Sequence, residues 1–186
     1  MTIDESFKLF GPISVLLTWV AIGYILITIE RDMAKSISHH AAIKRKNYII
    51  FSSLMSASLV AMYLFMINWF IPTFQLPLLF SVVIVLAILL EFTATFVPLT
   101  TGWRFTVHQL TSYGTALLIP ILLITITLSS TISIISFYVA LGSIFLVFLL
   151  LCLFLLVKEM RSHYLVYQSL YVLAFHTTLI VVMYFR

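Results

Sequence analysis

The stretch "LAILLEFTATFVP", from Leu86 to Pro98, places one carboxylic acid, Glu91, inside a long apolar run. Runs of this kind cross membranes, because a helix needs roughly 20 apolar residues to traverse a hydrocarbon core about 30 Å thick. A charged side chain deep in a bilayer costs about 2.5 to 3.5 kcal/mol on insertion scales, so it normally faces the protein interior. The stretch therefore predicts a membrane helix whose acid is directed at other helices.

The rest of the chain repeats this pattern. Of the 186 residues, 63% are hydrophobic and 9% are charged, whereas about a quarter of the residues in soluble domains are charged. Hydrocarbon tolerates only helices or closed barrels, and these uniformly apolar runs lack the alternation of barrel strands. The sequence predicts an all-α fold, a polytopic membrane bundle of six transmembrane helices that forms a single domain over residues 1–186. The expected helices cover residues 9–29, 48–71, 76–97, 106–128, 133–157 and 165–185.

The basic residues predict how the bundle is oriented. Eight of the ten Lys and Arg residues fall in the first, third and fifth connections between helices. By the positive-inside rule these connections are cytoplasmic. Both termini are therefore expected on the non-cytoplasmic side, in the plasma membrane of a prokaryote, with the first helix retained and not cleaved as a signal peptide. The eight residues are Arg31, Lys35, Lys44, Arg45, Lys46, Arg104, Lys158 and Arg161.

Three of these basic residues, Lys44, Arg45 and Lys46, directly precede the second expected helix. They act either as a stop-transfer and orientation signal or as a contact for anionic lipid headgroups, each basic residue then contributing about 1 kcal/mol. Because topology accounts for the net charge of +4, no nucleic-acid partner is expected. The expected partners are membrane lipids, with a second copy of the chain or another membrane protein as further possibilities.

Two stripes of small residues predict close packing between helices. In the second expected helix, Ser53, Ala57 and Ala61 recur at intervals of four residues. A similar stripe follows the start of the fifth expected helix and consists of Ser133, Ser136, Ala140 and Ser143.

The candidate site centres on Glu91 and on His108 of the next expected helix. Counted from the ends of their helices at about 1.5 Å per residue, the two lie roughly 10 Å and 6 Å from the same membrane surface. A short loop joins the helices, so the side chains are expected to meet, with Thr95, Thr111 and Arg104 as additional partners. Two interpretations stay open: a polar clamp between helices, or a ligand-binding or proton site.

Secondary polar positions lie in and before the last helix, at His163, Gln168 and His176. A haem held by one His from each of two helices is disfavoured, because His176 lies roughly 20 Å deeper than His163 and axial ligands must share one level. The spacing of the other histidines matches no recognised zinc pattern, and the single cysteine, Cys152, excludes a Cys-rich site. We therefore expect no cofactor and no metal.

The segment "FVPLTTGWRFTVHQLTSYGTALLIPILL" combines a helix end at Pro98, a short loop, His108, small residues and Pro120. It resembles the matching stretch of a group of six-helix membrane proteins that includes the DRAM, Frag and Sfk families and related bacterial proteins of unknown function. The segments "SISHHAAIKRKNYIIF" and "YQSLYVLAFHTTLIVVMYF" extend this resemblance, although His39, His40 and Ala41 replace the usual acid and glycine of the first motif. The resemblance implies that His108 is a family-type position and that the function concerns lipid organisation or remodelling.

These features favour a non-enzymatic integral membrane protein that binds or organises lipid through a polar intramembrane pocket near the cytoplasmic leaflet. The alternative is a small proton-coupled transporter or permease component, in which Glu91 takes up and releases the coupling proton. A haem-binding protein or an intramembrane enzyme is a further alternative. The sequence contains no nucleophile, phosphate-loop or metalloprotease motif.

Overall fold

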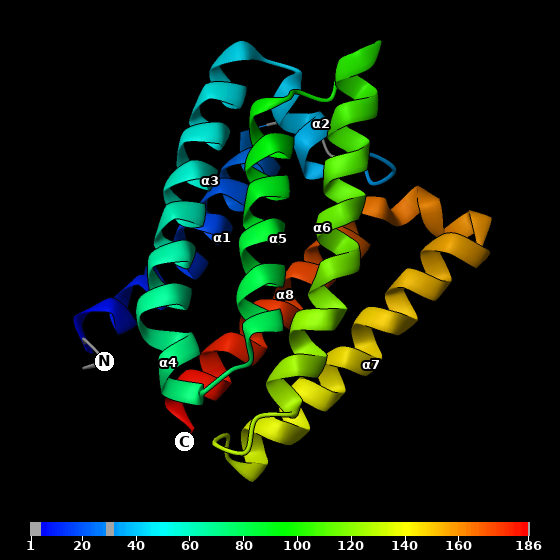
Figure 1. Cartoon of the computed structure of the whole chain (residues 1–186). Helices are drawn as coiled ribbons and strands as arrows, with labels where there is room; N and C mark the ends of the chain where they lie inside the picture. Colours follow the sequence, from blue (N-terminus) through cyan, green and yellow to red (C-terminus); the bar gives the residue numbers. More distant parts are fainter. Residues whose placement is uncertain (1–4, 29–31, 186) are drawn as a thin grey trace.

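The computed structural model describes residues 5–28 and 32–185, which contain helices and no strand. Among these residues, six helical spans are long and apolar enough to cross a membrane, which is compatible with an integral membrane protein. The predicted all-α six-helix architecture is confirmed (Figure 1). The spans are Glu5–Thr28 (ending in α1, Phe10–Thr28), Arg45–Phe74 (α3, Arg45–Phe65, to α4, Ile71–Phe74), α5 (Leu78–Phe96), α6 (Trp103–Thr127), α7 (Ile134–Leu156) and α8 (Tyr164–Tyr184).

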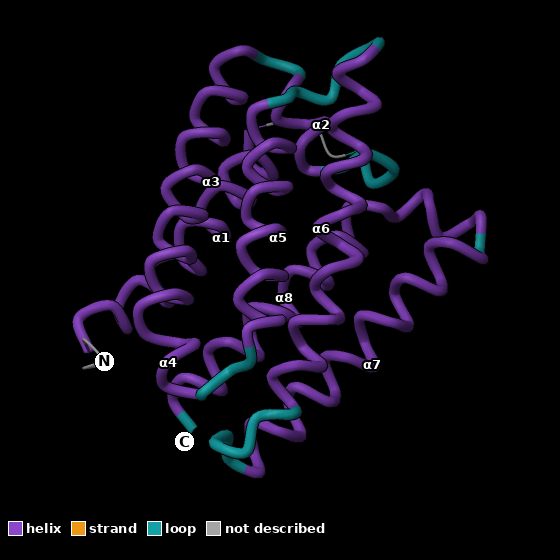
Figure 2. Tube along the Cα trace, in the orientation of Figure 1, coloured by secondary structure: helices purple, strands orange, loops and turns teal. Residues whose placement is uncertain are grey.

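Two short helices lie in the connections between these spans. Helix α2 (Ile37–Ala42) follows α1, and a 3-10 helix (Lys158–His163) joins α7 to α8. Ser36 caps α2, and its hydroxyl accepts a hydrogen bond from the His39 N–H over 3.1 Å. The tube in Figure 2 shows that loops are confined to the two ends of the bundle.

The second span is longer than the sequence pattern predicts. It begins at Arg45 and continues beyond residue 71 through a π-helical turn, Met66–Phe70, into α4. Pro72 lies in the first turn of α4, where it lacks the N–H that an uninterrupted α-helix would use. A local π-turn shifts the hydrogen-bonding pattern and lets the chain remain helical past such a position.

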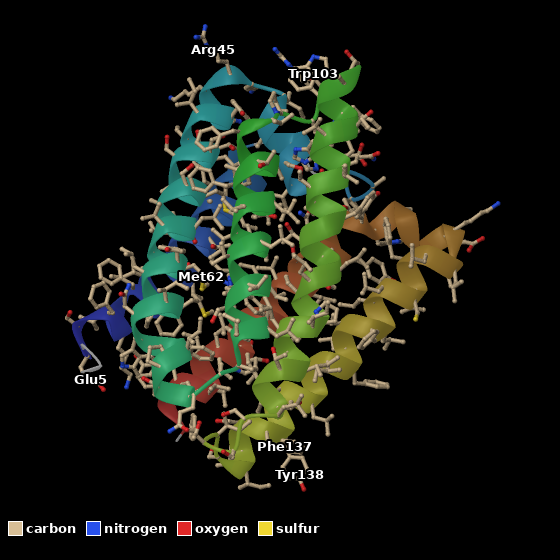
Figure 3. All side chains as sticks on the ribbon, in the orientation of Figure 1. Glu5, Arg45, Met62, Trp103, Phe137 and Tyr138 are labelled. Atoms are coloured by element: carbon tan, nitrogen blue, oxygen red, sulfur yellow. The ribbon has the colours of Figure 1, made fainter. Side chains whose placement is uncertain are left out.

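The spans form pairs that follow the chain. Helix α1 packs against α3, α5 against α6, α6 against α7, and α7 against α8. Figure 1 shows α7 and α8 steeply inclined to α3 and α5, with α2 at the end of the bundle opposite the termini. We call this end, which carries the connections after α1, α5 and α7, the basic end. Figure 3 shows Arg45 and Trp103 there, with Phe137 and Tyr138 at the other end.

Aromatic side chains fill the end of the bundle near the termini. Phe65, Trp69, Phe70, Phe74 and Phe80 are each at most 1% exposed. The Phe65 and Trp69 rings stack with centroids 5.5 Å apart, and the Phe70 and Phe74 centroids are 4.9 Å apart. Aromatic pairs of this kind contribute about 0.5 to 1.5 kcal/mol beyond the area they bury.

Only one of the two predicted small-residue stripes lies at a helix interface throughout. On α7, Ser136, Ala140 and Ser143 are buried, and the Ser143 hydroxyl donates to the Ala174 carbonyl of α8 over 3.2 Å. On α3, Ser53 and Ala57 are exposed, so the prediction for that helix is wrong. The face of α3 that packs against α1 is set by hydroxyl groups, which a pattern based on residue size alone does not take into account.

On α3, the buried Ser58 takes the place that was predicted for Ala57. Its hydroxyl lies 3.0 Å from that of Ser14 and 2.7 Å from that of Thr18. A hydroxyl in hydrocarbon needs a hydrogen-bond partner, and rotation of the Ser58 face toward α1 provides two.

Candidate functional site

A cavity of about 250 Å³ lies between the membrane-spanning helices; we call it the inner cavity. All six spans and α2 contribute lining residues. Most of these are apolar, such as Met62, which lies in the middle of the bundle (Figure 3). Polar side chains that line it include Glu91, Thr95 and His108. The inner cavity therefore contains the core of the predicted site.

A second cavity, of about 260 Å³, lies at the basic end; we call it the outer cavity. Its lining includes Lys35 and His39 from the connection after α1, and Gln109 from α6. Seven residues line both cavities, and we call them the shared ring: Ser38, His108, Ser112, Tyr113, Phe154, Tyr164 and Gln168. All but Phe154 have a side chain that can form hydrogen bonds. A polar ring thus joins a polar outer cavity to a largely apolar inner one.

His108 connects three parts of the basic end. It is 4% exposed, and its Nδ1–H donates to the Val97 carbonyl at the end of α5 over 2.7 Å. Because the carbonyl requires a donor, Nδ1 carries the proton, and in the neutral ring Nε2 accepts from the Ser38 hydroxyl over 2.9 Å. His108 therefore fixes α2 and the end of α5 to α6.

Gln168 anchors α2 from the opposite side. Its Oε1 accepts a hydrogen bond from the Ile37 N–H over 3.0 Å. Nearby, the Leu165 N–H donates to the Met33 carbonyl over 3.0 Å. Contacts with both α6 and α8 thus hold α2 over the shared ring.

Glu91 lies deeper in the bundle than His108. Its carboxyl interacts with the Thr115 hydroxyl on α6. Glu91 also lies close enough to Tyr164 for the two side chains to interact electrostatically. Thr115 follows His108 by seven residues, which corresponds to roughly 10 Å along a helix. Both ring nitrogens of His108 have other partners. The two residues line one cavity, but the expected direct contact is absent between these described side chains.

The three other primary candidates differ in their placement. Thr95 is buried and lines the inner cavity. Thr111 is buried, but its hydroxyl donates to the Val107 and His108 carbonyls of its own helix, and it lines neither cavity. Arg104 is exposed, and its guanidinium lies 5.7 Å from the Trp103 ring centroid, away from both cavities. Only Thr95 of the three thus joins Glu91 and His108.

The secondary candidates differ in whether they line a cavity. Gln168 belongs to the shared ring, and His176, which is 7% exposed, lines the inner cavity. Within the described residues, the His176 Nδ1 has no hydrogen-bond partner, and the ring packs edge-on against Trp19 with centroids 6.4 Å apart. His163 is exposed in the 3-10 helix, bonds to Ser162 over 2.9 Å and lines neither cavity.

The remaining predicted positions lie outside both cavities. Lys44, Arg45 and Lys46 are exposed where α3 begins, at the basic end. Cys152 is exposed on α7. The described residues include no group of three or more His, Cys, Asp or Glu side chains that could hold a metal ion.

The charges around the outer cavity influence one another. Lys35 Nζ lies 3.2 Å from the Asp32 carboxylate. The Ala34 N–H, together with Lys35, holds the pKa of Asp32 below its ordinary value. Burial lowers the pKa of His39, and the nearby Lys35 and His40 add to this effect. Lys35 thus brings a basic side chain to the outer cavity, and at neutral pH His39 brings an uncharged imidazole.

The sequence pattern did not identify several residues of this site. Ser38, Lys35 and His39 lie in a polar connection whose six-residue helix has too little periodicity to be recognised. Tyr164 and Tyr171, seven residues apart on α8, both line the inner cavity. That spacing, which places two aromatic side chains with hydroxyls on one helix face, is the signal that could have found them.

Comparison of the chain with protein-family models, with curated proteins and with solved structures finds no match. The resemblance to the DRAM, Frag and Sfk group therefore stays a prediction from the quoted motifs.

Proposed function

We propose that the protein is an integral membrane protein that binds a lipid, with the hydrocarbon chain in the inner cavity and the polar part at the shared ring and in the outer cavity. The observation that carries this proposal is the shared ring itself, whose polar side chains separate a mainly apolar cavity from a polar one. A molecule with one apolar end and one polar end matches both environments without burying an unpaired polar group.

The position of the inner cavity supports a lipid ligand. It lies between helices that are long and apolar enough to cross a bilayer, and the surrounding lipids supply hydrocarbon chains that match its apolar lining. Ligand pockets are typically concave, mostly apolar and equipped with a few polar groups, with volumes on the order of 300 to 1,000 Å³. The two cavities joined at the ring have this character.

Glu91 favours a second candidate, proton-coupled transport. Among the described residues that line either cavity, it is the only acid. Intramembrane acids often mark proton relays. In a lipid-binding protein, Glu91 instead lies beside the part of the ligand just below the ring. Proton-dependent uptake of a solute by liposomes containing the protein would favour transport over lipid binding.

Filling the inner cavity tests the proposal. Ala87 is 5% exposed and lines this cavity, so Ala87→Leu adds three carbon atoms to its wall. Gly142 is exposed on α7, and a Cβ added there meets nothing within 4 Å. Gly142→Leu therefore enlarges a side chain outside the cavity and serves as the matched control.

Both variants and the wild type would be purified in mild detergent, and the copurified lipid would be quantified by mass spectrometry. We expect bound lipid in the wild type, markedly less in Ala87→Leu and an unchanged amount in Gly142→Leu. Thermal melts would confirm that Ala87→Leu is folded. Equal lipid content in the two folded variants would contradict binding in the inner cavity.

For the orientation, we infer that the basic end faces the cytoplasm of a prokaryotic cell and that both termini face outward. The exposed Lys44, Arg45 and Lys46, as well as Lys35 and Lys158, lie in the connections or in the adjoining first turn of α3, at one end of the bundle. Cytoplasmic connections carry such an excess of basic residues.

A further inference from the structure

The residues of the outer cavity indicate the chemistry of its ligand. Apart from the shared ring, its lining comprises Ala34, Lys35, Ser36, His39, Leu99 and Gln109. Within the described part of the chain, no acid lines it, whereas Glu91 lies on the inner side of the ring. The outer cavity thus favours an anion.

Donors come from two different elements around the outer cavity. Lys35 and His39 belong to the connection that includes α2, and Gln109 and Tyr113 belong to α6. A phosphate group has several acceptor oxygens directed to different sides, so it can use donors that a planar carboxylate cannot reach together. Lysine binds phosphate as a point charge and needs no fixed bidentate geometry.

We propose that the outer cavity binds a phosphate group, with Lys35 as the permanent cation and with His39 and Gln109 as further donors. For a phosphate that is part of a lipid headgroup, the inference rests on the proposed function, because the attached chain then passes the shared ring into the inner cavity. A free phosphate would use the same donors without occupying the inner cavity.

Asp32 makes this inference testable. Its carboxylate holds Lys35 at 3.2 Å and accepts a hydrogen bond from the Ala34 N–H over 3.1 Å, yet it does not line the cavity. Asp32→Asn keeps an oxygen for the Ala34 N–H but removes the charge that competes with phosphate for Lys35. If Lys35 served only to pair with Asp32, this change would not strengthen phosphate binding.

The experiment measures binding of two lipids with identical acyl chains to delipidated protein in detergent by native mass spectrometry. Phosphatidylglycerol carries a phosphodiester, and diacylglycerol carries none. Lys35→Gln is compared with Lys158→Gln, which removes an exposed charge at the basic end outside both cavities. His39→Gln is compared with His163→Gln, which removes a histidine that lines neither cavity.

We expect Lys35→Gln to weaken phosphatidylglycerol binding about fivefold, the effect of one basic residue near an anionic group, and to leave diacylglycerol binding unchanged. His39→Gln should weaken it less, Asp32→Asn should strengthen it, and the Lys158 and His163 variants should match the wild type. Equal effects of Lys35→Gln and Lys158→Gln, or equal wild-type affinity for both lipids, would overturn the phosphate inference while leaving lipid binding intact.

Two further outcomes separate the sources and the proposals. Competition by millimolar inorganic phosphate in the wild type, lost in Lys35→Gln, would support the phosphate site and identify free phosphate as a ligand. Binding of neither lipid and no effect of inorganic phosphate would overturn both this inference and the proposed function.

Discussion

Replacing His108 with Ala removes two hydrogen bonds from one buried ring. The Val97 carbonyl loses its donor at 2.7 Å and the Ser38 hydroxyl loses its partner at 2.9 Å. An unsatisfied buried polar group costs about 1 to 3 kcal/mol, and truncation of a buried ring adds the cost of the space left behind. We expect His108→Ala to lower the free energy of unfolding by about 2 to 4 kcal/mol.

Two double-mutant cycles locate the partners of His108. With Ser38→Ala, the double mutant should be more stable than the sum of the single effects predicts, because both changes remove one shared hydrogen bond. Coupling between residues in contact is typically about 0.5 to 3 kcal/mol. With Glu91→Gln, the effects should add within about 0.5 kcal/mol, because the acid interacts with Thr115, seven residues farther along α6.

The assay is equilibrium unfolding of each variant in mixed micelles with increasing mole fractions of a denaturing detergent, followed by far-UV circular dichroism. Thermal melts in mild detergent provide a second ranking. A coupling energy above about 1 kcal/mol between His108 and Glu91, or none between His108 and Ser38, would refute this register of α5 against α6 and α2.

Two other predictions concern α1 and the orientation. Gly11→Ala would place a Cβ 2.9 Å from the Phe65 ring, which is 1% exposed and stacked on Trp69. This overpacking should lower the free energy of unfolding by about 1 to 2 kcal/mol, after the gain in helix propensity is subtracted. Gly23→Ala in the same helix meets nothing within 4 Å and should stabilise by up to about 1 kcal/mol; unfolding in detergent would show opposite signs, and equal signs would contradict this packing. In a chain that lacks Cys152, a cysteine near either terminus should react with an impermeant maleimide on intact cells, whereas Ile43→Cys should react only after lysis; the reverse pattern would mean the opposite orientation.

The six spans were predictable because length and hydropathy alone determine which segments can cross hydrocarbon. The ends of these helices were less predictable where basic residues or proline determine them. Arg45 and Lys46 lie within the first turn of α3, because long basic side chains can extend away from the bundle toward water. Pro72 did not end the second span, because the π-turn before it, in which the Ile71 N–H donates to the Met66 carbonyl, keeps the chain helical up to the proline.

The candidate site was predictable in composition but not in its contacts. Glu91, Thr95, His108, Gln168 and His176 line the cavities, as expected of polar groups that hydrocarbon excludes. The cationic side of the site lies in a connection, where lysines and histidines carry no signal that distinguishes a ligand site from a solvated loop. Only the docking of α2 onto α6 and α8 places them beside the ring.

The missed contact between Glu91 and His108 has a general cause. Depth counted from each helix end assumes that neighbouring helices end at one level, yet His108, the sixth residue of α6, bonds to Val97, where α5 ends. The first turns of α6 therefore extend past α5, as Figure 1 shows. Because the offset moves Glu91 inward to the level of Thr115, the acid lies below the ring and does not line the outer cavity. The position of Glu91 is therefore compatible with the proposed phosphate site, because a carboxylate at the ring itself would repel the phosphate that Lys35 is proposed to bind.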